Sequence, residues 1–206
     1  MKRVFTILIL LVTALCCNAH STDKNTIKFM GHPVDGSKTR MRIHLLKNGF
    51  TYNKYTDYYI GSFNGYTVRV GISTYKKKVD RIHVTFEYTD ELNIRYDYNN
   101  LIKQFNKNNK YISFIENKLI SQNEDISNEI TKNNGRFYAE YFYKPQIDSL
   151  ESVENLKEEL IRRYTNEQLE EILTGHVWFI ISKINNAYMI ELFYDNLNNR
   201  PKGEDL

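Results

Sequence analysis

Residues 58–88 read YYIGSFNGYTVRVGISTYKKKVDRIHVTFEY. Within this stretch Asn64-Gly65 is the strongest short hairpin signal, because a two-residue type I′ turn needs positive φ at both central positions. Runs rich in β-branched and aromatic residues lie on either side of the pair, and a third run follows a lysine-rich turn. The three predicted strands are 58–63, 66–73 and 79–88. They form an antiparallel meander.

Alternation of side chains assigns the two faces of this meander. In the second and third strands every other residue is apolar, and the residues between them are polar or charged. The apolar set is Tyr66, Val68, Val70, Ile72, Ile82, Val84, Phe86 and Tyr88, and the polar set is Thr67, Arg69, Ser73, Arg81, His83, Thr85 and Glu87. One face is therefore predicted to pack on a core and the other to face water.

Helix signals precede and follow the meander. Ser37 is a good N-cap and Gly49 a good stop for a helix that ends at Lys47. A second amphipathic pattern covers residues 98–107. The order helix, hairpin, strand then recurs, with predicted strands at 126–131 and 136–143 around the turn Asn133-Asn134-Gly135.

A charged helical insertion, residues 149–174, interrupts this second unit. We predict a break near Tyr164, after which a capping box from Thr165 to Gln168 restarts the helix. The chain closes with strands at 176–183 and 187–195 in a last hairpin, and with a loosely held polar tail at 196–206.

These elements predict one α+β domain over residues 20–206. Its antiparallel sheet consists of two degenerate helix-plus-strand repeats, about 27–93 and 94–195, with helices packed on one face. The length is normal for a single hydrophobic core, and no Gly/Ser-rich linker divides the chain.

The N-terminus has the pattern of a cleavable signal peptide, residues 1–19. Two basic residues precede an apolar run that is too short to span a bilayer, and small residues lead to cleavage after Ala19. The alternative is a lipoprotein signal, in which an acylated Cys16 or Cys17 would anchor the domain to a membrane. No later segment is apolar enough to predict a membrane span.

Cleavage would remove both cysteines, so we expect no disulfide, thiolate nucleophile or cysteine-ligated metal. It would also remove two of the 28 basic residues, which leaves them nearly balanced with the 25 acidic residues. A balanced surface gives no electrostatic case for nucleic acid. No asparagine lies in an Asn-x-Ser/Thr sequon, which favours a bacterial periplasmic or extracellular location.

Three motifs carry a resemblance to known proteins. They are Ile27 to Gly36 (IKFMGHPVDG), Gly49-Phe50, and Phe193 to Asn196 with the closing Gly203-Glu204-Asp205-Leu206. In these motifs the chain resembles a group of secreted proteins of gut Bacteroidales, which implies a compartment rather than a chemistry. The tandem units also resemble, in topology, the β-lactamase-inhibitor-like fold shared with small outer-membrane assembly lipoproteins. Fold analogy carries no function by itself.

Motifs for catalysis, metals or cofactors do not stand out. The histidines His32, His44, His83 and His176 are dispersed without metal-binding spacing, so we predict no metal and no cofactor. The acidic pairs are Asp90-Glu91, Glu124-Asp125, and Asp148 with Glu151. Each pair sits where carboxylates cap helices or solubilise loops, which favours capping over the paired-carboxylate chemistry of glycosidases.

The least routine feature is aromatic, because both faces of the C-terminal strands are apolar. Residues such as Val177 alternate with a second apolar set that includes Tyr138, Phe142, Trp178 and Phe193. These four are the predicted binding residues, since Trp and Tyr anchor interfaces out of proportion to their number. The competing interpretation is that the inserted helices cover this face, because two-sided apolar strands usually lie under helices.

The sequence therefore favours a non-catalytic binding or envelope-interaction domain with a protein or glycan partner. The alternative is a secreted hydrolase whose site is assembled from scattered carboxylates. A deep polar pocket with convergent carboxylates would indicate the enzyme, and an open aromatic sheet face would indicate the binding domain.

The export prediction can be checked on secreted protein. We expect it to begin at His20 and to carry no lipid, because signal peptidase can seat the small residues before the cut. Intact-mass measurement is the test, and an acyl group on Cys16 or Cys17 would overturn the expectation.

Overall fold

The computed structural model describes residues 26–88, 90–132, 135–147, 155–184 and 187–200. Its strands are β1 (Lys28–Phe29), β2 (His32–Pro33), β3 (Thr51–Asn53), β4 (Tyr58–Phe63), β5 (Tyr66–Tyr75), β6 (Lys78–Tyr88), β7 (Tyr111–Ile112), β8 (Tyr138–Tyr143), β9 (Gly175–Ile184) and β10 (Ala187–Asn196). Its helices are α2 (Lys38–Lys47), α3 (Glu91–Lys107), α4 (Ile126–Thr131), α5 (Leu156–Arg163) and α6 (Asn166–Ile172), followed by a short 3-10 turn, η2 (Leu197–Asn199).

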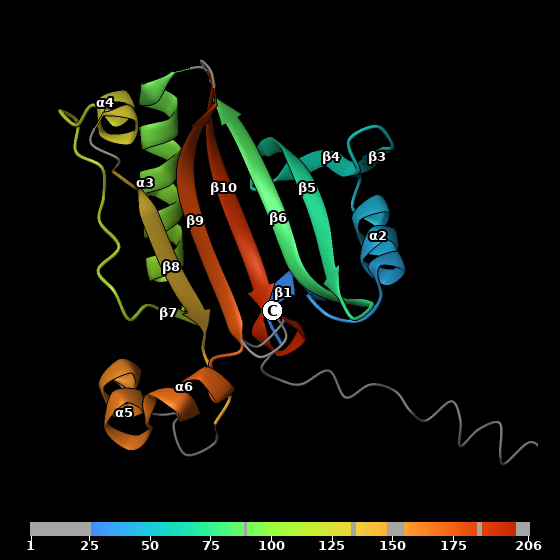
Figure 1. Cartoon of the computed structure of the whole chain (residues 1–206), viewed down its shortest axis with the longest axis vertical. Helices are drawn as coiled ribbons and strands as arrows, with labels where there is room; N and C mark the ends of the chain where they lie inside the picture. Colours follow the sequence, from blue (N-terminus) through green and yellow to red (C-terminus); the bar gives the residue numbers. More distant parts are fainter. Residues whose placement is uncertain (1–25, 89, 133–134, 148–154, 185–186, 201–206) are drawn as a thin grey trace, which may run out of the picture.

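Eight strands form one antiparallel sheet in the order β3-β4-β5-β6-β10-β9-β8-β7, while β1 and β2 pair separately. Each half of the chain supplies a helix and four strands, α2 with β3 to β6 and α3 with β7 to β10. The halves meet in the middle of the sheet, where β10 pairs with β6. The predicted α+β class is confirmed, with helices on one side of an antiparallel sheet (Figure 1).

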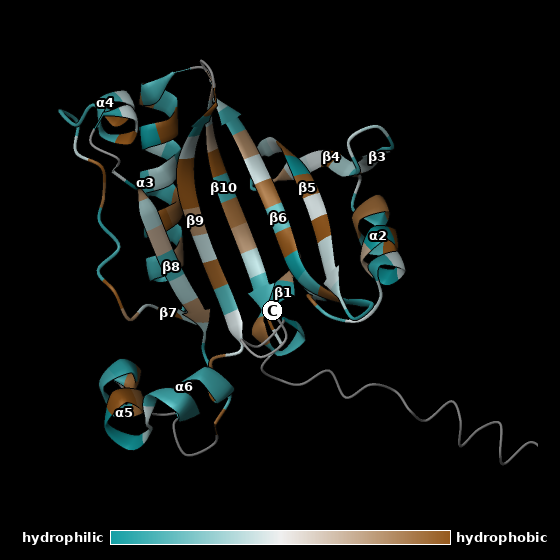
Figure 2. Cartoon of the chain, viewed as in Figure 1, coloured by the Kyte–Doolittle hydropathy of each residue, from teal (hydrophilic) through white to brown (hydrophobic). Residues whose placement is uncertain are grey.

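The core lies between the sheet and the two long helices. Met41 and Leu45 of α2 and Ile94 and Tyr98 of α3 are buried in one cluster with alternate residues of the strands. Figure 2 shows this alternation as apolar and hydrophilic bands along β6, β9 and β10. Burial of these apolar side chains between the sheet and the two helices stabilises the fold by roughly 25 cal/mol for each Å² of apolar surface removed from water.

Local helix signals explain where the helices begin. The hydroxyl of Ser37 accepts a hydrogen bond from the backbone of Arg40 and caps α2, as the sequence predicts. The carboxylate of Asp90 caps α3 through Asn93, so this helix begins before the predicted Tyr98.

Residues 126–131 form helix α4, so the strand predicted there is wrong. Asp125 caps the helix, and the carboxylate of Glu91 accepts from the next two backbone N–H groups. Two carboxylates therefore accept hydrogen bonds from the free backbone N–H groups of the first turn. These bonds stabilise the start of a helix and would not stabilise a strand. Strand β8 pairs instead with β7 and β9, and Asn133-Asn134 lies outside the described residues.

The helical insertion consists of α5 and α6. Its predicted break at Tyr164 and the capping box between Thr165 and Gln168 are confirmed. Both helices lie beyond the ends of β8 and β9 rather than over the sheet (Figure 1). Leu160 is the one buried residue of the two helices, so they have little apolar surface with which to cover a sheet face. For the described part of the chain, the covering interpretation is wrong; residues 149–154 lie outside that part.

The segment after β10 is also not loosely held, at least as far as Arg200. The backbone N–H of Leu197 donates to the carbonyl of Thr174 (2.7 Å), and the side chain of Asn199 donates to the carbonyl of Val79 (2.8 Å). Its polar side chains satisfy backbone groups of distant elements, which composition alone does not reveal. The remaining residues of the predicted tail lie outside the described ranges.

Both edges of the sheet are blunted. The edge strands β3 and β7 have three and two residues. Along the exposed edge of β8, the side chain of Asn117 accepts from the backbone N–H of Glu140 and donates to its carbonyl, both at 3.0 Å. An amide side chain thus takes the place of a further strand, so little edge is left for pairing with another chain.

Across the described ranges, no helix combines the length and the apolar character needed to cross a membrane. The predicted signal peptide, residues 1–19, lies outside these ranges. Its cleavage, and the extent of the domain over residues 20–206, stay predictions.

The Asn64-Gly65 turn allows a direct test of the central meander. Its φ angles are 53° and 84°, both positive as a type I′ turn requires, and no atom lies near the place of a Cβ on Gly65. Any cost of Gly65→Val therefore comes from the backbone, and we expect roughly 1 to 3 kcal/mol of destabilisation in urea unfolding. The control Thr67→Val puts the same side chain at an exposed position of β5 and should change stability by less than about 0.5 kcal/mol. Equal denaturation midpoints for both variants would contradict the turn assignment.

Candidate functional site

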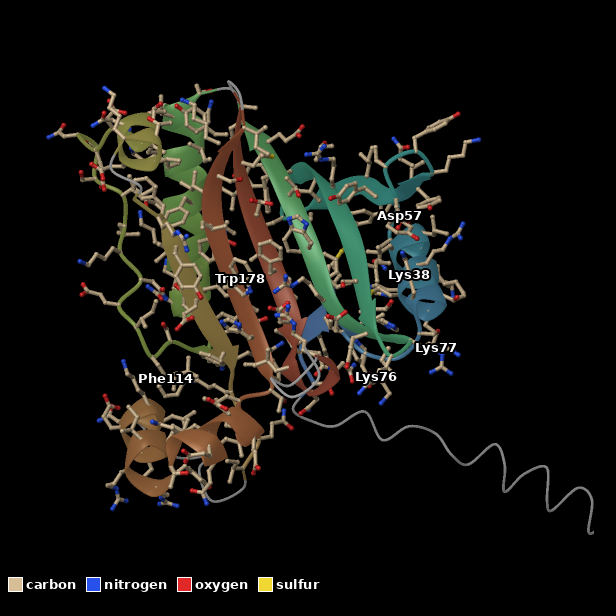
Figure 3. The ribbon with its side chains drawn as sticks, in the orientation of Figure 1. Lys38, Asp57, Lys76, Lys77, Phe114 and Trp178 are labelled. Atoms are coloured by element: carbon tan, nitrogen blue, oxygen red, sulfur yellow. The ribbon has the colours of Figure 1, made fainter. Side chains whose placement is uncertain are left out.

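The sheet face opposite α2 and α3 is the candidate site, and we call it the open face. Tyr138, Phe142, Trp178 and Phe193 all lie on it, because they alternate with core residues along β8, β9 and β10. Figure 3 looks onto this face, with Trp178 near the middle of the sheet. Among the described residues, no helix lies across it (Figure 1).

Three rings form a stack across the middle of the open face. His83, Phe193 and Trp178 are cross-strand neighbours on β6, β10 and β9. The ring centroids of His83 and Phe193 are 4.4 Å apart, and those of Phe193 and Trp178 are 4.0 Å apart, with interplanar angles of 8° and 18°. Phe193 therefore has a ring against each of its faces. Tyr138 continues the row with a tilted contact to Trp178 at 6.0 Å.

A buried carboxylate holds this stack in place. Asp195 is 0 % exposed and accepts from Nε and Nη2 of Arg81 at 2.5 and 2.8 Å. It also accepts from Nε1 of Trp178 and Nη1 of Arg200, each at 2.9 Å. The guanidinium of Arg81 lies 4.7 Å from the Phe193 centroid, within the range of cation–π attraction. Four donors satisfy a carboxylate that burial would otherwise penalise heavily.

Two histidine–glutamate pairs lie on the open face, and the histidine of one of them, His83, belongs to the stack itself. His83 lies 3.4 Å from Glu191, and His176 lies 3.5 Å from Glu140. The nearby histidine lowers the pKa of each glutamate, and the phenol of Tyr138, which donates to Glu140 at 2.6 Å, lowers the pKa of Glu140 further. Both glutamates are therefore anionic at neutral pH, which suits ion pairing and disfavours a role as general acid.

Phe142 lies apart from the stack. Its ring stacks on His176 at 4.6 Å and meets Phe114 edge-on at 5.7 Å, at the end of the sheet next to α5 and α6. A groove of about 1010 Å³ opens there between the helices and strands β8 and β9. The four predicted residues thus divide into a cluster of three in the middle of the open face and one at its end, in the wall of this groove.

The sequence missed the charged half of the site. Arg81 and His83 were placed on the wet face of the meander, but their contact with the aromatic set depends on the pairing of β6 with β10. That pairing joins residues more than a hundred positions apart, such as Arg81 and Asp195. Thr85, predicted on the wet face, is buried there.

The other candidate residues have structural roles. The carboxylates of Asp90, Glu91, Glu124 and Asp125 accept from backbone N–H groups at helix starts and in a turn, as the capping interpretation predicts. Asp148 and Glu151 lie outside the described residues. His32 stacks on His44 at 4.6 Å. In the part of the chain that the structure covers, no group of three or more His, Cys, Asp or Glu residues could hold a metal ion.

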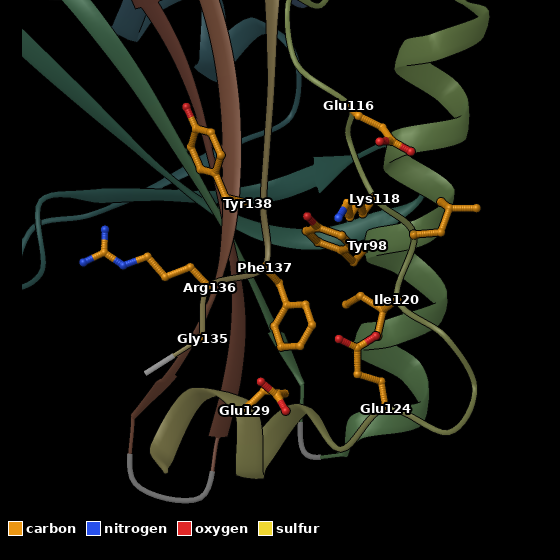
Figure 4. Close-up of a pocket in the computed structure, with 11 residues that line it drawn as sticks. Tyr98, Glu116, Lys118, Ile120, Glu124, Glu129, Gly135, Arg136, Phe137 and Tyr138 are labelled. Atoms are coloured by element: carbon orange, nitrogen blue, oxygen red, sulfur yellow. The ribbon is translucent and has the colours of Figure 1, made fainter. Parts of the chain in front are cut away.

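A second, smaller pocket of about 320 Å³ lies between α3, α4 and the start of β8. Figure 4 shows Glu124 and Glu129 pointing toward Phe137 in this pocket. Lys118 and Arg136 also line it, so its charges are mixed and no single ligand charge is favoured.

Breaking the buried ion pair of Asp195 should cost more stability than breaking an exposed ion pair on the same face. Asp195→Ala leaves Arg81 half-buried without its partner, and we expect a loss of about 3 to 5 kcal/mol of stability in urea unfolding. The matched control is Glu87→Ala, which breaks the exposed pair with Arg69 on the same face and should cost less than about 1 kcal/mol. Similar losses in both variants would show that Asp195 does not organise the face.

The chain was compared with family models, with curated proteins and with solved structures. None of the three comparisons found a match.

Proposed function

We propose that this chain is an exported, non-catalytic binding protein whose open face docks another protein. One observation carries the proposal: a stacked aromatic row is held by a buried ion cluster on a sheet face that no described helix covers. Aromatic ring edges on a sheet face that no described helix covers are typical of an interaction surface. Trp and Arg side chains, fixed in place before binding, are the residues that dominate interface energies.

The geometry of the stack favours a protein over a glycan. A sugar packs on the flat face of an aromatic ring, and both faces of Phe193 are occupied by His83 and Trp178. What the row offers outward is ring edges flanked by ionised groups such as Glu191 and Arg81. Such a mixture of apolar edges and fixed charges suits side chains of a partner protein.

The blunted sheet edges support docking on the face rather than at an edge. Strand addition needs a row of unpaired backbone groups, and Asn117 already occupies those of Glu140 in β8. The opposite edge strand, β3, has three residues. We therefore assign the contact to side chains of the open face.

Hydrolysis is the second candidate function, favoured by the Glu140–His176 pair on the wall of the groove. A histidine oriented by a carboxylate can act as a general base on water. The described residues that line the groove include no serine, threonine or cysteine, and Glu140, Glu191 and Asp195 each face a basic partner rather than one another. Turnover of a chromogenic ester, peptide or glycoside that His176→Gln abolishes would favour this alternative.

The location is part of the proposal and rests on sequence. The leader 1–19 and the resemblance to secreted proteins of gut Bacteroidales support a periplasmic or extracellular protein. A lipid anchor on Cys16 or Cys17 is the alternative. The resemblance to the β-lactamase-inhibitor-like fold stays a prediction that concerns topology.

Site-specific photo-cross-linking tests which face docks the partner. A benzophenone amino acid replaces Ile180, which neighbours Tyr138 on the open face, or Leu92, which is 71 % exposed on α3. The mature protein is irradiated with envelope and culture-supernatant fractions of the bacterium that encodes it. We expect a discrete cross-linked species from position 180 and none from position 92, because only the open face is organised as an interface.

Two controls keep the cross-linking result interpretable. Thermal unfolding must show that both labelled proteins are folded. The second control is the variant Trp178→Phe, which keeps an aromatic ring but lacks the Nε1–H group that donates to Asp195. Equal labelling from both positions, or labelling from Leu92 alone, would contradict docking on the open face.

A further inference from the structure

We propose that the groove beside α5 and α6 receives a basic peptide segment of the partner protein, anchored by an apolar side chain. This inference rests on the proposed function and names the chemistry of the partner. The groove is about 1010 Å³ in volume, which is enough for several side chains. It lies at the end of the open face, where Phe142 and His176 form part of its wall.

Six apolar side chains line the groove, and we call this set its floor. Its apolar side chains are Phe114, Phe142, Ile161, Leu169, Leu173 and Leu197. Leu173 is 5 % exposed and forms part of the floor, whereas Ile161 on α5 is 55 % exposed although it is aliphatic. Leu160 and Leu173 are buried but stand outside the main core cluster, so the two helices form a separate wall. An apolar floor with an exposed aliphatic side chain favours an apolar anchor on the ligand.

Four glutamates line the same groove, and we call this set its rim. Glu140, Glu167, Glu170 and Glu171 line it, and no Lys or Arg is among the described residues that do. The nearby cations are already engaged: Arg162 and Arg163 pair with Glu159, and Lys157 donates to the carbonyl of Phe114 at 3.2 Å. Glu140 faces His176, but Glu167, Glu170 and Glu171 form no ion pair among the described residues, and uncompensated carboxylates favour a cationic partner.

The acidic residues of α6 place like charges close together, although Glu167 itself stands in the first turn, where a carboxylate favours a helix. Glu167, Glu170 and Glu171 are spaced i, i+3 and i+4, so their carboxylates share one helix face and repel one another. No basic residue stands in the last turn of α6 to offset them. A bound Lys or Arg would relieve this repulsion, which gives the cationic ligand a favourable contribution that a neutral ligand lacks.

The apolar floor and the acidic rim together favour a peptide over other cationic ligands. A bare metal ion needs converging ligands, and the described residues hold no such group. A hydrophilic polycation would satisfy the glutamates but leave the apolar floor in water. A segment with Lys or Arg on both sides of an apolar residue satisfies both parts of the groove.

The binding test uses three fluorescein-labelled synthetic peptides, KLKFKLK, ELEFELE and KSKSKSK, with the mature protein in fluorescence anisotropy. We expect KLKFKLK to bind, with an affinity that falls as salt is raised, and the other two to bind about tenfold more weakly or not at all. Binding of ELEFELE or KSKSKSK as tightly as KLKFKLK, or no binding of KLKFKLK, would overturn the inference.

Matched variants locate the peptide. Glu170→Gln/Glu171→Gln removes two charges from the rim and should weaken KLKFKLK about fivefold or more. Glu116→Gln/Glu158→Gln removes two exposed charges outside the groove and should leave the affinity unchanged. Because all four positions are exposed, both proteins are expected to fold, and thermal unfolding verifies this. Equal weakening by the two variants would overturn the assignment to the groove.

The cross-linking contrast between Ile180 and Leu92 separates failure of this inference from failure of the proposed function. If KLKFKLK does not depend on the rim but Ile180 still cross-links selectively, the groove is not the peptide site and the open face remains the docking surface. If position 180 does not cross-link selectively in the otherwise native protein, the open face is not the docking surface, whatever affinities the peptides show.

Discussion

The carboxylate of Asp195 is the group on which the open face depends. It is fully buried on a side of the sheet that has no covering layer among the described residues, and it is satisfied by Arg81, Trp178 and Arg200. These partners come from β6, β9 and the turn after β10, so one anion fixes the seam between the two halves of the sheet and the orientation of the tryptophan. Removing the partners of such a buried carboxylate costs far more free energy than breaking an exposed ion pair. The arrangement is therefore rigid before any partner binds.

The asymmetry of the sheet follows from this arrangement. On one face, α2 and α3 bury alternate residues in a single apolar core. On the other, rings and charges cover one another: Phe193 is nearly buried by His83 and Trp178 without any helix above it. A sheet face that hides its apolar surface through stacking and ion pairs can remain in water and still offer aromatic edges to a partner. The groove at its end differs, because three of its four carboxylates, those of Glu167, Glu170 and Glu171, form no ion pair among the described residues.

Much of the fold could be predicted from local signals. The Asn64-Gly65 turn, the Ser37 cap, the break at Tyr164 and the alternation in β9 and β10 are each determined by a few neighbouring residues. The errors came from interactions between distant segments. Glu91 turns 126–131 into a helix by binding its first N–H groups, and Asn199 fastens the polar tail by bonding to Val79. The same limit applies to the site: Tyr138, Trp178 and Phe193 could be placed on one face, but their partners Arg81, His83 and Asp195 depend on which strands pair.

The measurement that tests the central claim most directly is acrylamide quenching of tryptophan fluorescence in the mature protein. The chain has a single tryptophan, so the signal reports the open face alone. Trp178 is half-buried: its ring stacks on Phe193 and contacts Tyr138, and its Nε1 donates to the buried carboxylate of Asp195. Its quenching constant should therefore fall between that of a free tryptophan analogue and that of a fully buried residue. Absence of quenching would mean that another part of the chain covers this face, and it would contradict the account of an open docking surface.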